Sequence, residues 1–523
     1  MSGPRADGAA AARVPAPAGG RRLLFFMRAI NYDRLFEGAL RELLGRGHRI
    51  HVLLDVEKRG TAGDSALLDA LRADFPHFSY GTIPARNGGV WDGFGTALRF
   101  AIDYLRYLEP LYENARALRE RARARAPRLV VWLGDRIGRH RGGRRSFGAV
   151  LRVVEASLPD QRGARAFVEG FAPNAVLVTP LVGLGSPQGD YVRAARLFGA
   201  ATVFPVASWD NLTNKGVIRD VPNLTIVWNE AQRREAVGLH GLPVDSVVVT
   251  GSHSFDHWFD WEPSTDRETF CTPLGLDPER PYLLYVGSSR FIARDEARFV
   301  ARWIEQLRRS DEPELREANV VVRPHPANFA IWDETDPSEP GRVVIHPRDV
   351  VRPTTKERKS QYYDSIYHST AVVGINTSAL IESGILGRRV FTITSPEFRD
   401  TQEGTLHFAY LTGENGEGLV NVARDFLEHE RQLATALREA GGSFGDSFVL
   451  DFLRPYGRHV AASPLFADAV ECLAAEPSRP RRRPLWHALV RAVVAPFVYF
   501  GALAIPPLRR AGLIGGRRKP KRA

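Results

Sequence analysis

Residues suited to phosphate binding gather in two segments of the second half of the chain. In the first segment, Arg323 and His325 follow the apolar run Val320–Val322 and alternate with Pro324 and Pro326. Such a run is typical of a buried parallel strand, so its polar residues would stand at the carboxyl edge of a sheet. A guanidinium offers a fork of donors that matches phosphate oxygens, and an imidazole adds another donor. We therefore expect Arg323 and His325 to contact an anion.

The second segment places two hydroxyl groups at the start of a predicted helix. Asn376, Thr377 and Ser378 follow the apolar run Val372–Gly374 and precede a helical pattern that contains Glu382. Free backbone N–H groups and the positive end of the helix dipole attract anions at such a position. Together the two segments predict a pocket for a diphosphate.

A polar cluster in the first half of the chain has the composition of a sugar-binding loop. Trp209, Asp210, Asn211 and Lys215 follow directly after a predicted strand. An aromatic ring can stack on a sugar, and carboxylate, amide and ammonium groups can bond to its hydroxyls. We expect this loop to face the same cleft as the phosphate pocket and to contact the acceptor of a group transfer.

The loop after the first predicted strand should reach the same cleft. It carries Arg28, Asn31 and Asp33, of which the first two are candidates for acceptor binding. Transfer to a hydroxyl group needs a base. Either Asp33 or Asp210 could supply it.

The chain lacks the usual means of holding a divalent cation against a diphosphate, because no Asp-x-Asp pair occurs in it. The charge of a departing diphosphate would then be met by Arg323, His325 and the helix dipole near Ser378. The sequence predicts a reaction that needs no metal ion and no cofactor.

Alternating strand-like and helix-like blocks must position these residues, and they indicate an α/β fold of doubly wound parallel sheets. The predicted parts are a disordered tail over 1–22, a Rossmann-like domain over 23–260, a linker over 261–281, a second Rossmann-like domain over 282–475 and a basic tail over 476–523. The two domains are expected to face each other across a cleft.

Short apolar runs mark the expected strands. In the first domain these are residues 23–27, 49–54, 129–133, 175–179, 201–205, 224–228 and 246–250. In the second domain they are residues 282–286, 319–323, 342–346, 371–374 and 389–393. Long helical stretches are expected over 94–125 and 146–171.

Charge and cysteine content narrow the class of protein. The net charge is +11, but residues 478–523 contain twelve basic residues and no acidic one, which leaves −1 on the rest of the chain. A nearly neutral body argues against nucleic-acid binding. Cys271 and Cys472 lie far apart, and residues 1–20 lack the apolar core of a signal peptide. We therefore expect a reduced, cytoplasmic environment.

The basic tail has the features of an interfacial membrane anchor. An uncharged stretch over 492–508 contains Phe497, Tyr499 and three prolines, and arginines flank it on both sides. The stretch is at the short end of what can cross a bilayer, and its symmetric basic flanks favour a segment that lies on the membrane. We expect residues 479–523 to bind an anionic membrane surface at the inner face of the cell membrane. A packed C-terminal helix followed by a disordered basic end is the alternative.

The motifs named above resemble those of the GT-B glycosyltransferase superfamily. The resemblance is to the branch shared by UDP-N-acetylglucosamine 2-epimerases, CDP-glycerol glycerophosphotransferases and capsule-type sugar transferases. The segments that carry it are Val322–Pro326, Gly374–Ser378 with Glu382, Gly387–Val390 and Val249–Gly251.

This resemblance implies that the second domain holds a nucleoside-diphosphate sugar and that the acceptor approaches from the first domain. By position, Gly287 and Ser288 would form a loop beneath the phosphates, and Glu382 would meet the ribose or the base. The resemblance also implies that Arg323, His325, Asn376, Thr377 and Ser378 surround the diphosphate.

Two departures from the family patterns bear on the reaction. The epimerases have a His-Arg-rich signature where this chain has Gly287–Phe291, and the glycerophosphotransferases have an Asp-Tyr-Ser-Ser turn where it has Asn376–Ser378. The prediction is therefore a glycosyltransferase that extends an envelope or capsular polysaccharide or a lipid-linked acceptor. The alternatives are an epimerase or hydrolase, a glycerophosphotransferase, and a non-catalytic envelope assembly protein.

Overall fold

The computed structural model describes residues 19–510, except for 55–64, 139, 350–354, 414–416, 440–443 and 477–478, and it describes no side chains over 503–510. Most of the predicted disordered tail and the end of the basic tail, 511–523, lie outside the described residues. The first strand starts at Arg22, which the prediction had placed in the disordered tail.

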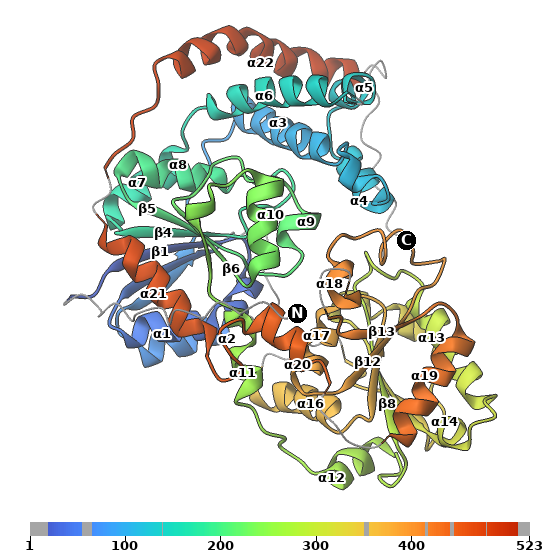
Figure 1. The fold of residues 1–523 in the computed structure, drawn as a ribbon. Coiled ribbons are helices and arrows are strands. Elements are labelled where there is room, and N and C mark those ends of the chain that lie inside the picture. Colours follow the sequence, from blue (N-terminus) through green and yellow to red (C-terminus); the bar gives the residue numbers. More distant parts are fainter. Residues whose placement is uncertain are drawn as a thin grey trace, which may run out of the picture.

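Two parallel sheets form the centres of two α/β domains (Figure 1). The first sheet has seven strands in the order β3-β2-β1-β4-β5-β6-β7, and the second has six in the order β10-β9-β8-β11-β12-β13. In each sheet the order reverses beside the first strand, which is the doubly wound topology. The prediction of two Rossmann-like domains is confirmed.

The strands of the first sheet are β1 (Arg22–Met27), β2 (Arg49–Leu54), β3 (Phe78–Thr82), β4 (Ala175–Thr179), β5 (Ala201–Pro205), β6 (Leu224–Val227) and β7 (Val247–Val249). Those of the second sheet are β8 (Tyr282–Val286), β9 (Asn319–Arg323), β10 (Val343–Ile345), β11 (Ala371–Gly374), β12 (Arg389–Ile393) and β13 (Val420–Ala423).

Apolar runs become strands here because helices bury both faces of each sheet. In β8, Leu283 and Tyr285 join one core cluster, and Leu284 and Val286 join the cluster on the opposite face. Such strands read as continuous apolar runs without polar alternation. The covering helices include α1 (Glu37–Gly45), α2 (Ala66–Asp74), α7 (Arg162–Phe171), α8 (Gly189–Phe198), α10 (Glu230–His240), α13 (Glu296–Arg308), α16 (Lys356–Tyr367), α17 (Ser378–Ile385) and α19 (Phe426–Arg438).

A separate layer of helices stands between β3 and β4 in the chain and lies above the first sheet (Figure 1). Its helices are α3 (Val90–Arg106), α4 (Arg116–Arg123), α5 (Arg128–Ile137) and α6 (Arg141–Ala156), and the C-terminal helix α22 (Trp486–Arg510) packs on α3 and α6. None of the described helices combines the length and the hydropathy that a segment spanning a bilayer needs.

The predicted strand over residues 129–133 is wrong, because these residues belong to helix α5. Gly134 lets the helix approach α3 closely, since a Cβ at this position would stand 3.1 Å from Tyr104. The Tyr104 hydroxyl also donates to Asp135 at 2.7 Å. The strand that completes the sheet is β3, whose sequence Phe78–Thr82 contains only isolated apolar residues.

Helix α21 (Ala462–Ala475) returns the chain to the first domain, so the predicted range 282–475 for the second domain ends too late. Phe466 and Val470 are buried in the core of the first domain, beside α1. Glu471 accepts hydrogen bonds from Arg46 at 2.7 Å and from the His48 ring at 2.6 Å. By its packing and its polar contacts, the helix therefore belongs to the first domain.

The predicted linker over 261–281 packs on the second domain. It contains the short helix α12 (Arg267–Cys271), and Phe270 and Cys271 are buried in the core of that domain. Ser264 and Thr265 donate hydrogen bonds to Asp364 of α16 at 2.6 and 2.8 Å. The apolar residues between the prolines explain why this segment is folded.

Candidate functional site

The carboxyl edges of the two sheets meet at two adjoining cavities. The basic cavity, of about 300 Å³, is lined by Arg34, Arg323 and His325 together with Asn31, Gly287, Pro324, Pro326, Tyr362, Thr377, Ser378, Ala379, Glu382 and others. The aromatic cavity, of about 250 Å³, is lined by Trp209, Trp228, Trp258 and Trp261 with Ser208, His257 and Lys359. Arg34, Tyr362, Ser378 and Glu382 line both cavities.

The basic cavity lies where the strand order of the second sheet reverses, between β8 and β11. This is where doubly wound sheets leave a crevice at their carboxyl edge. The loop after β8 must pass very close to the loop after β9, because a Cβ at Gly287 would stand 2.8 Å from the His325 nitrogen. The Gly287 N–H donates to the Arg323 carbonyl at 2.9 Å. Only glycine fits this position without displacing the loop after β9, and Gly287 lines the basic cavity.

Ser288 and Asn376 support the cavity from behind and do not line it. The Ser288 N–H donates to both carboxyl oxygens of Glu296, at 2.9 and 2.8 Å, and its hydroxyl accepts from the Asn376 N–H at 3.4 Å. Burial raises the pKa of Glu296 to about 8, although the Ser288 N–H opposes the rise. The Asn376 amide donates to Thr405 at 3.1 Å. Both residues were predicted to contact the nucleotide sugar. In the structure they bond to each other, to Glu296 and to Thr405 instead.

Arg323 ends β9 with its guanidinium 4.6 Å from the centre of the Tyr362 ring. Its Nη1 atom is buried and has no hydrogen-bond partner among the described residues. Burial lowers the pKa of Arg323, against the opposing effect of Tyr362 and other neighbours. A buried donor without an acceptor is rare in a folded protein. An anion in the basic cavity would satisfy it.

His325 and the start of α17 also line the basic cavity. The His325 Nδ1 atom accepts from the Ala327 N–H at 3.0 Å, so the neutral ring carries its proton on Nε2. Thr377 precedes α17 with extended backbone angles, φ −146° and ψ 151°, and its side chain does not cap the helix. The first N–H groups of α17 and the Thr377 hydroxyl can therefore bond to a ligand.

Glu382 stands one turn into α17, at the boundary of the two cavities. The Tyr362 hydroxyl donates to its carboxylate. Burial raises the pKa of Glu382 to about 7, despite the Tyr362 hydrogen bond and the charges of Arg34 and Arg323. A carboxyl group with this pKa can accept or donate a proton near neutral pH. The sequence placed Glu382 near the ribose or base and gave no sign of this property.

The sugar-binding loop predicted in the first domain is only partly exposed to the cleft. Trp209 lines the aromatic cavity and packs edge-on against His407, with ring centres 4.3 Å apart. Asp210 forms an ion pair with Lys215 at 2.7 Å and accepts from the Asn211 amide at 3.2 Å. Burial disfavours the Asp210 carboxylate, but Lys215 and then His407 outweigh it and hold the pKa below its usual range.

Neither cavity is lined by Asp210, Asn211 or Lys215. A carboxylate with a depressed pKa and a salt-bridge partner is a weak base. The geometry therefore does not favour the predicted catalytic role of Asp210.

The loop after β1 also divides into residues that line the cleft and residues that do not. Asn31, a predicted acceptor contact, lines the basic cavity and not the aromatic one. Asp33 is buried and accepts from the Arg34 N–H at 2.6 Å, and Arg28 lies against Gly183 in the first domain. Asp33 and Arg28 line neither cavity. The sequence missed Arg34, which follows Asp33 directly and lines both.

Contacts between the domains hold the cleft in the observed geometry. Lys359 of α16 pairs with Glu37 of α1 at 3.4 Å. The Tyr410 hydroxyl donates to Glu235 of α10, whose pKa burial raises to about 8. No group of three or more metal-ligating side chains occurs among the residues that the structure describes.

No family model matches the sequence, and no curated protein matches it. Among solved structures, a putative UDP-N-acetylglucosamine 2-epimerase from Listeria monocytogenes is similar at 11% identity and a TM-score of 0.49, over 89% of this chain and 100% of that one. A glycosyltransferase from Rickettsia africae is similar at 8% identity and a TM-score of 0.48, over 88% and 100% of the chains. The likeness extends over most of this chain, but at these identities and TM-scores it assigns neither a family nor a reaction.

Proposed function

We propose that this chain is a glycosyltransferase that needs no metal ion, with a nucleoside-diphosphate sugar bound in the basic cavity and its acceptor in the aromatic cavity. The observation that carries the proposal is the unpaired Nη1 atom of Arg323 beside the uncapped start of α17. Both point to a group rich in negative oxygens, such as a diphosphate.

The division of the cleft suits a transfer between two bound molecules. Arg34, Arg323 and His325 lie on the basic side, where the charge of a departing nucleoside diphosphate would develop. Four tryptophans lie on the other side, and aromatic faces suit the apolar faces of a sugar. The anomeric carbon would sit at the boundary, where the two cavities meet.

The proposed reaction moves one glycosyl group. The bond between the anomeric carbon and the phosphate oxygen breaks, and the electron pair leaves with the nucleoside diphosphate. A bond forms between the anomeric carbon and the acceptor oxygen, whose proton passes to Glu382. We assign the base to Glu382 because it lies at the boundary and has a pKa of about 7, in place of Asp210 and Asp33.

An epimerase or hydrolase acting on a nucleotide sugar is the second candidate. A carboxyl group that titrates near neutral pH could also remove a proton from the sugar or activate water. Incubation with nucleotide sugar alone separates the candidates, since only an epimerase or hydrolase forms product without an acceptor.

Titration calorimetry with UDP, GDP and CDP tests the donor site. We expect one of them to bind with a stoichiometry of one, and Arg323→Ala to weaken the binding. The matched control is Arg309→Ala. Arg309 is an exposed residue that follows the end of α13 in the second domain, and among the described residues its ion pair is with Glu305 of that helix. If none of the three nucleotides binds, or if the two variants bind equally well, the donor site is wrongly assigned.

The acceptor in this proposal belongs to a lipid-linked or envelope polysaccharide, and the C-terminal segment brings the enzyme to it. Helix α22 exposes Leu489, Val493, Phe497 and Phe500, each with 68–74% of its surface accessible. Apolar side chains and flanking arginines together favour an anionic membrane surface. This location, on the inner face of the cell membrane, is tested by sedimentation with vesicles that contain or lack phosphatidylglycerol.

A further inference from the structure

A third cavity, of about 750 Å³, lies in the first domain and shares no lining residue with the cleft. It is enclosed by the start of α3, the loop between α6 and α7, and α22, which contributes Arg491. Five arginines line it, namely Arg86, Arg99, Arg162, Arg165 and Arg491. Neither the sequence motifs nor the proposed reaction uses any of these residues.

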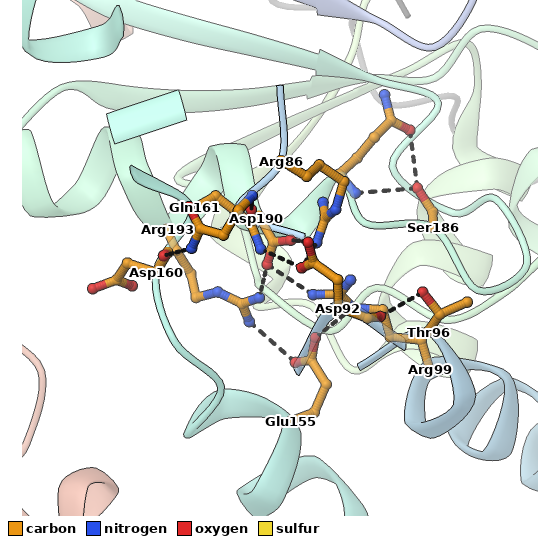
Figure 2. A network of polar contacts seen from close by, with 12 residues as sticks. Arg86, Asp92, Thr96, Arg99, Glu155, Asp160, Gln161, Ser186, Asp190 and Arg193 are labelled. Carbon is orange, nitrogen blue, oxygen red and sulfur yellow. Dashed lines mark hydrogen bonds and ion pairs between the residues drawn. The ribbon is translucent and has the colours of Figure 1, made fainter. Parts of the chain in front are cut away.

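A network of buried ion pairs forms the floor of this cavity (Figure 2). Arg99 bonds to Glu155 at 2.9 Å and to Asp190 at 2.8 Å, and Arg86 bonds to Asp190 and Asp92, each at 2.9 Å. Burial disfavours both Glu155 and Asp190 as carboxylates, but Arg193 and Arg99 outweigh it and lower their pKa values. Glu155 and Asp190 therefore stay ionised at neutral pH.

Each floor arginine keeps one nitrogen unused. The Nη1 atoms of Arg86 and Arg99 are buried and have no hydrogen-bond partner among the described residues. Gly95 lines the cavity, and a Cβ there would stand 3.9 Å from the Arg99 Nη1 atom. Arg99 is only 2% exposed, and a buried donor that is left without an acceptor lowers stability. The missing side chain of Gly95 leaves the donor next to the cavity.

The rim of the cavity carries positive charge that the protein does not balance. Within the described part of the chain, Arg162 and Arg491 form no ion pair. The two carboxylates in the lining are already paired, Asp92 with Arg86 and Asp160 with Arg483. The cavity as a whole therefore favours an anion.

The start of α3 adds to this preference. The helix has 17 residues, and Gly89 precedes it without a side-chain cap. The carboxylate of Asp92, in the first turn, offsets part of the positive potential at this helix end and accepts a hydrogen bond from the Gly88 N–H at 2.7 Å. Trp91 and Leu158 supply the apolar wall.

We infer that this cavity binds the phosphate headgroup of an anionic lipid. The lipid source is favoured over a free phosphate because α22, which closes the cavity, carries the exposed apolar face described above. Trp91, which lines the cavity, contacts Tyr499 of α22 edge-on, with ring centres 6.3 Å apart. The exposed apolar side chains lie on the side of α22 away from Arg491. A lipid whose headgroup entered between α3 and α22 would therefore lay its chains against Trp91 and Tyr499, while the exposed apolar face of α22 rests in the same membrane. The inference rests on the proposed membrane location and is independent of the cleft.

Calorimetry on the full chain with a short-chain phosphatidic acid, below its micelle concentration, tests the inference. We expect saturable binding with a stoichiometry of one. Arg162→Ala combined with Arg491→Ala should weaken it at least 10-fold, since two charged hydrogen-bond donors are lost. The control variant is Arg479→Ala combined with Arg482→Ala, which removes equal charge from exposed positions of the same tail outside the cavity.

A second variant keeps the charge and fills the floor. Gly95→Val places a side chain between the cavity and the Arg99 Nη1 atom, and it should also weaken lipid binding at least 10-fold. Its thermal unfolding identifies any folding defect, because a Cβ at this position would stand 3.0 Å from Leu158. Nucleotide binding in the cleft should be unchanged in every variant, so a failure of the donor site is seen separately.

Three outcomes overturn the inference. The first is no saturable binding of the short-chain lipid. The second is inorganic phosphate binding as tightly as the lipid, which would make the site one for a free anion. The third is an equal loss in the cavity variant and the tail control, which would mean that only the net charge of the protein matters.

Discussion

The two sheets share one strand order but use their carboxyl edges differently. At the second sheet, Arg323 keeps a buried nitrogen without a partner and Thr377 leaves the start of α17 uncapped. At the first sheet, Asp210 is paired with Lys215 and Asp33 accepts from the N–H of the next residue. Among the described residues both edges leave buried polar atoms without a partner, but they differ in kind and place. At the second edge the atom is a cationic donor of a residue that lines the cleft, whereas the Oδ1 atoms of Asn211 and Asn214 at the first edge belong to residues that line neither cavity.

This difference shows that a polar residue after a strand is only a candidate for binding. Loops at a sheet edge need buried polar contacts for their own stability, and an ion pair such as Asp210–Lys215 supplies one. An unsatisfied buried donor is a stronger sign of a ligand than the residue type. The comparison therefore supports the proposal that the donor binds at the second sheet and that the first sheet shapes the acceptor side.

The largest expected effect comes from Glu382→Gln. Loss of the base should lower kcat by about 10²–10⁴-fold, with nucleotide affinity changed by less than about two-fold. In the unmodified enzyme, activity should fall as the pH drops through about 7, because Glu382 must be deprotonated to act, and this fall should disappear in the variant. A pH–rate profile measures both. If affinity falls and the profile keeps its shape, Glu382 contacts the ribose or base instead.

The next effect comes from Arg323→Ala, which removes the unpaired donor of the second sheet. A charged hydrogen bond contributes about 1.5–3 kcal/mol, so affinity for the nucleoside diphosphate should fall about 10- to 100-fold. Binding measured at rising salt should also lose part of its salt dependence. If Arg323→Ala bound the nucleoside diphosphate as tightly as the unmodified protein, the second sheet edge would have no more claim to the donor site than the first.

The smallest effect comes from Lys215→Met, which breaks the ion pair of the first sheet. Because Asp210 and Lys215 keep 21% and 34% of their side-chain surface exposed, we expect a stability loss of only about 1 kcal/mol. The pKa of Asp210 is depressed, so its contribution is present above its usual pKa and is lost as the pH falls below it. Denaturant unfolding at pH 7 and pH 3 measures this. A large loss of nucleotide affinity would instead place Lys215 in the site.

Most of the fold could be predicted from the sequence, because the buried strands are unbroken apolar runs. Strand β9 shows this well, with Val320, Val321 and Val322 fully buried between two helix layers. The errors arose where the apolar pattern of a segment does not determine which type of element it forms or which domain it packs against. The apolar run over 129–133 lies in helix α5, where Val130 and Val131 pack on the cluster around Tyr104 and Leu118. Helix α21 packs on the first domain through contacts with residues more than 400 positions earlier in the chain, such as Arg46.

The part of the candidate site that could be predicted consists of polar residues that directly follow a predicted strand. Arg323, His325, Thr377 and Ser378 line one cavity, because parallel strands bring their carboxyl ends to one edge. Arg34 and Tyr362 could not be found in this way, since each enters the site from a helical segment of ordinary composition. The pKa of Glu382 depends on burial between the domains, which no local pattern encodes.

A crystal structure with the nucleoside diphosphate that binds best in calorimetry would test the central claim most directly. We predict phosphate oxygens within hydrogen-bond distance of the Arg323 Nη1 atom and of the first N–H groups of α17, with Glu382 facing the emptied sugar position. A diphosphate bound elsewhere, or one that leaves Arg323 Nη1 without a partner, would contradict the account.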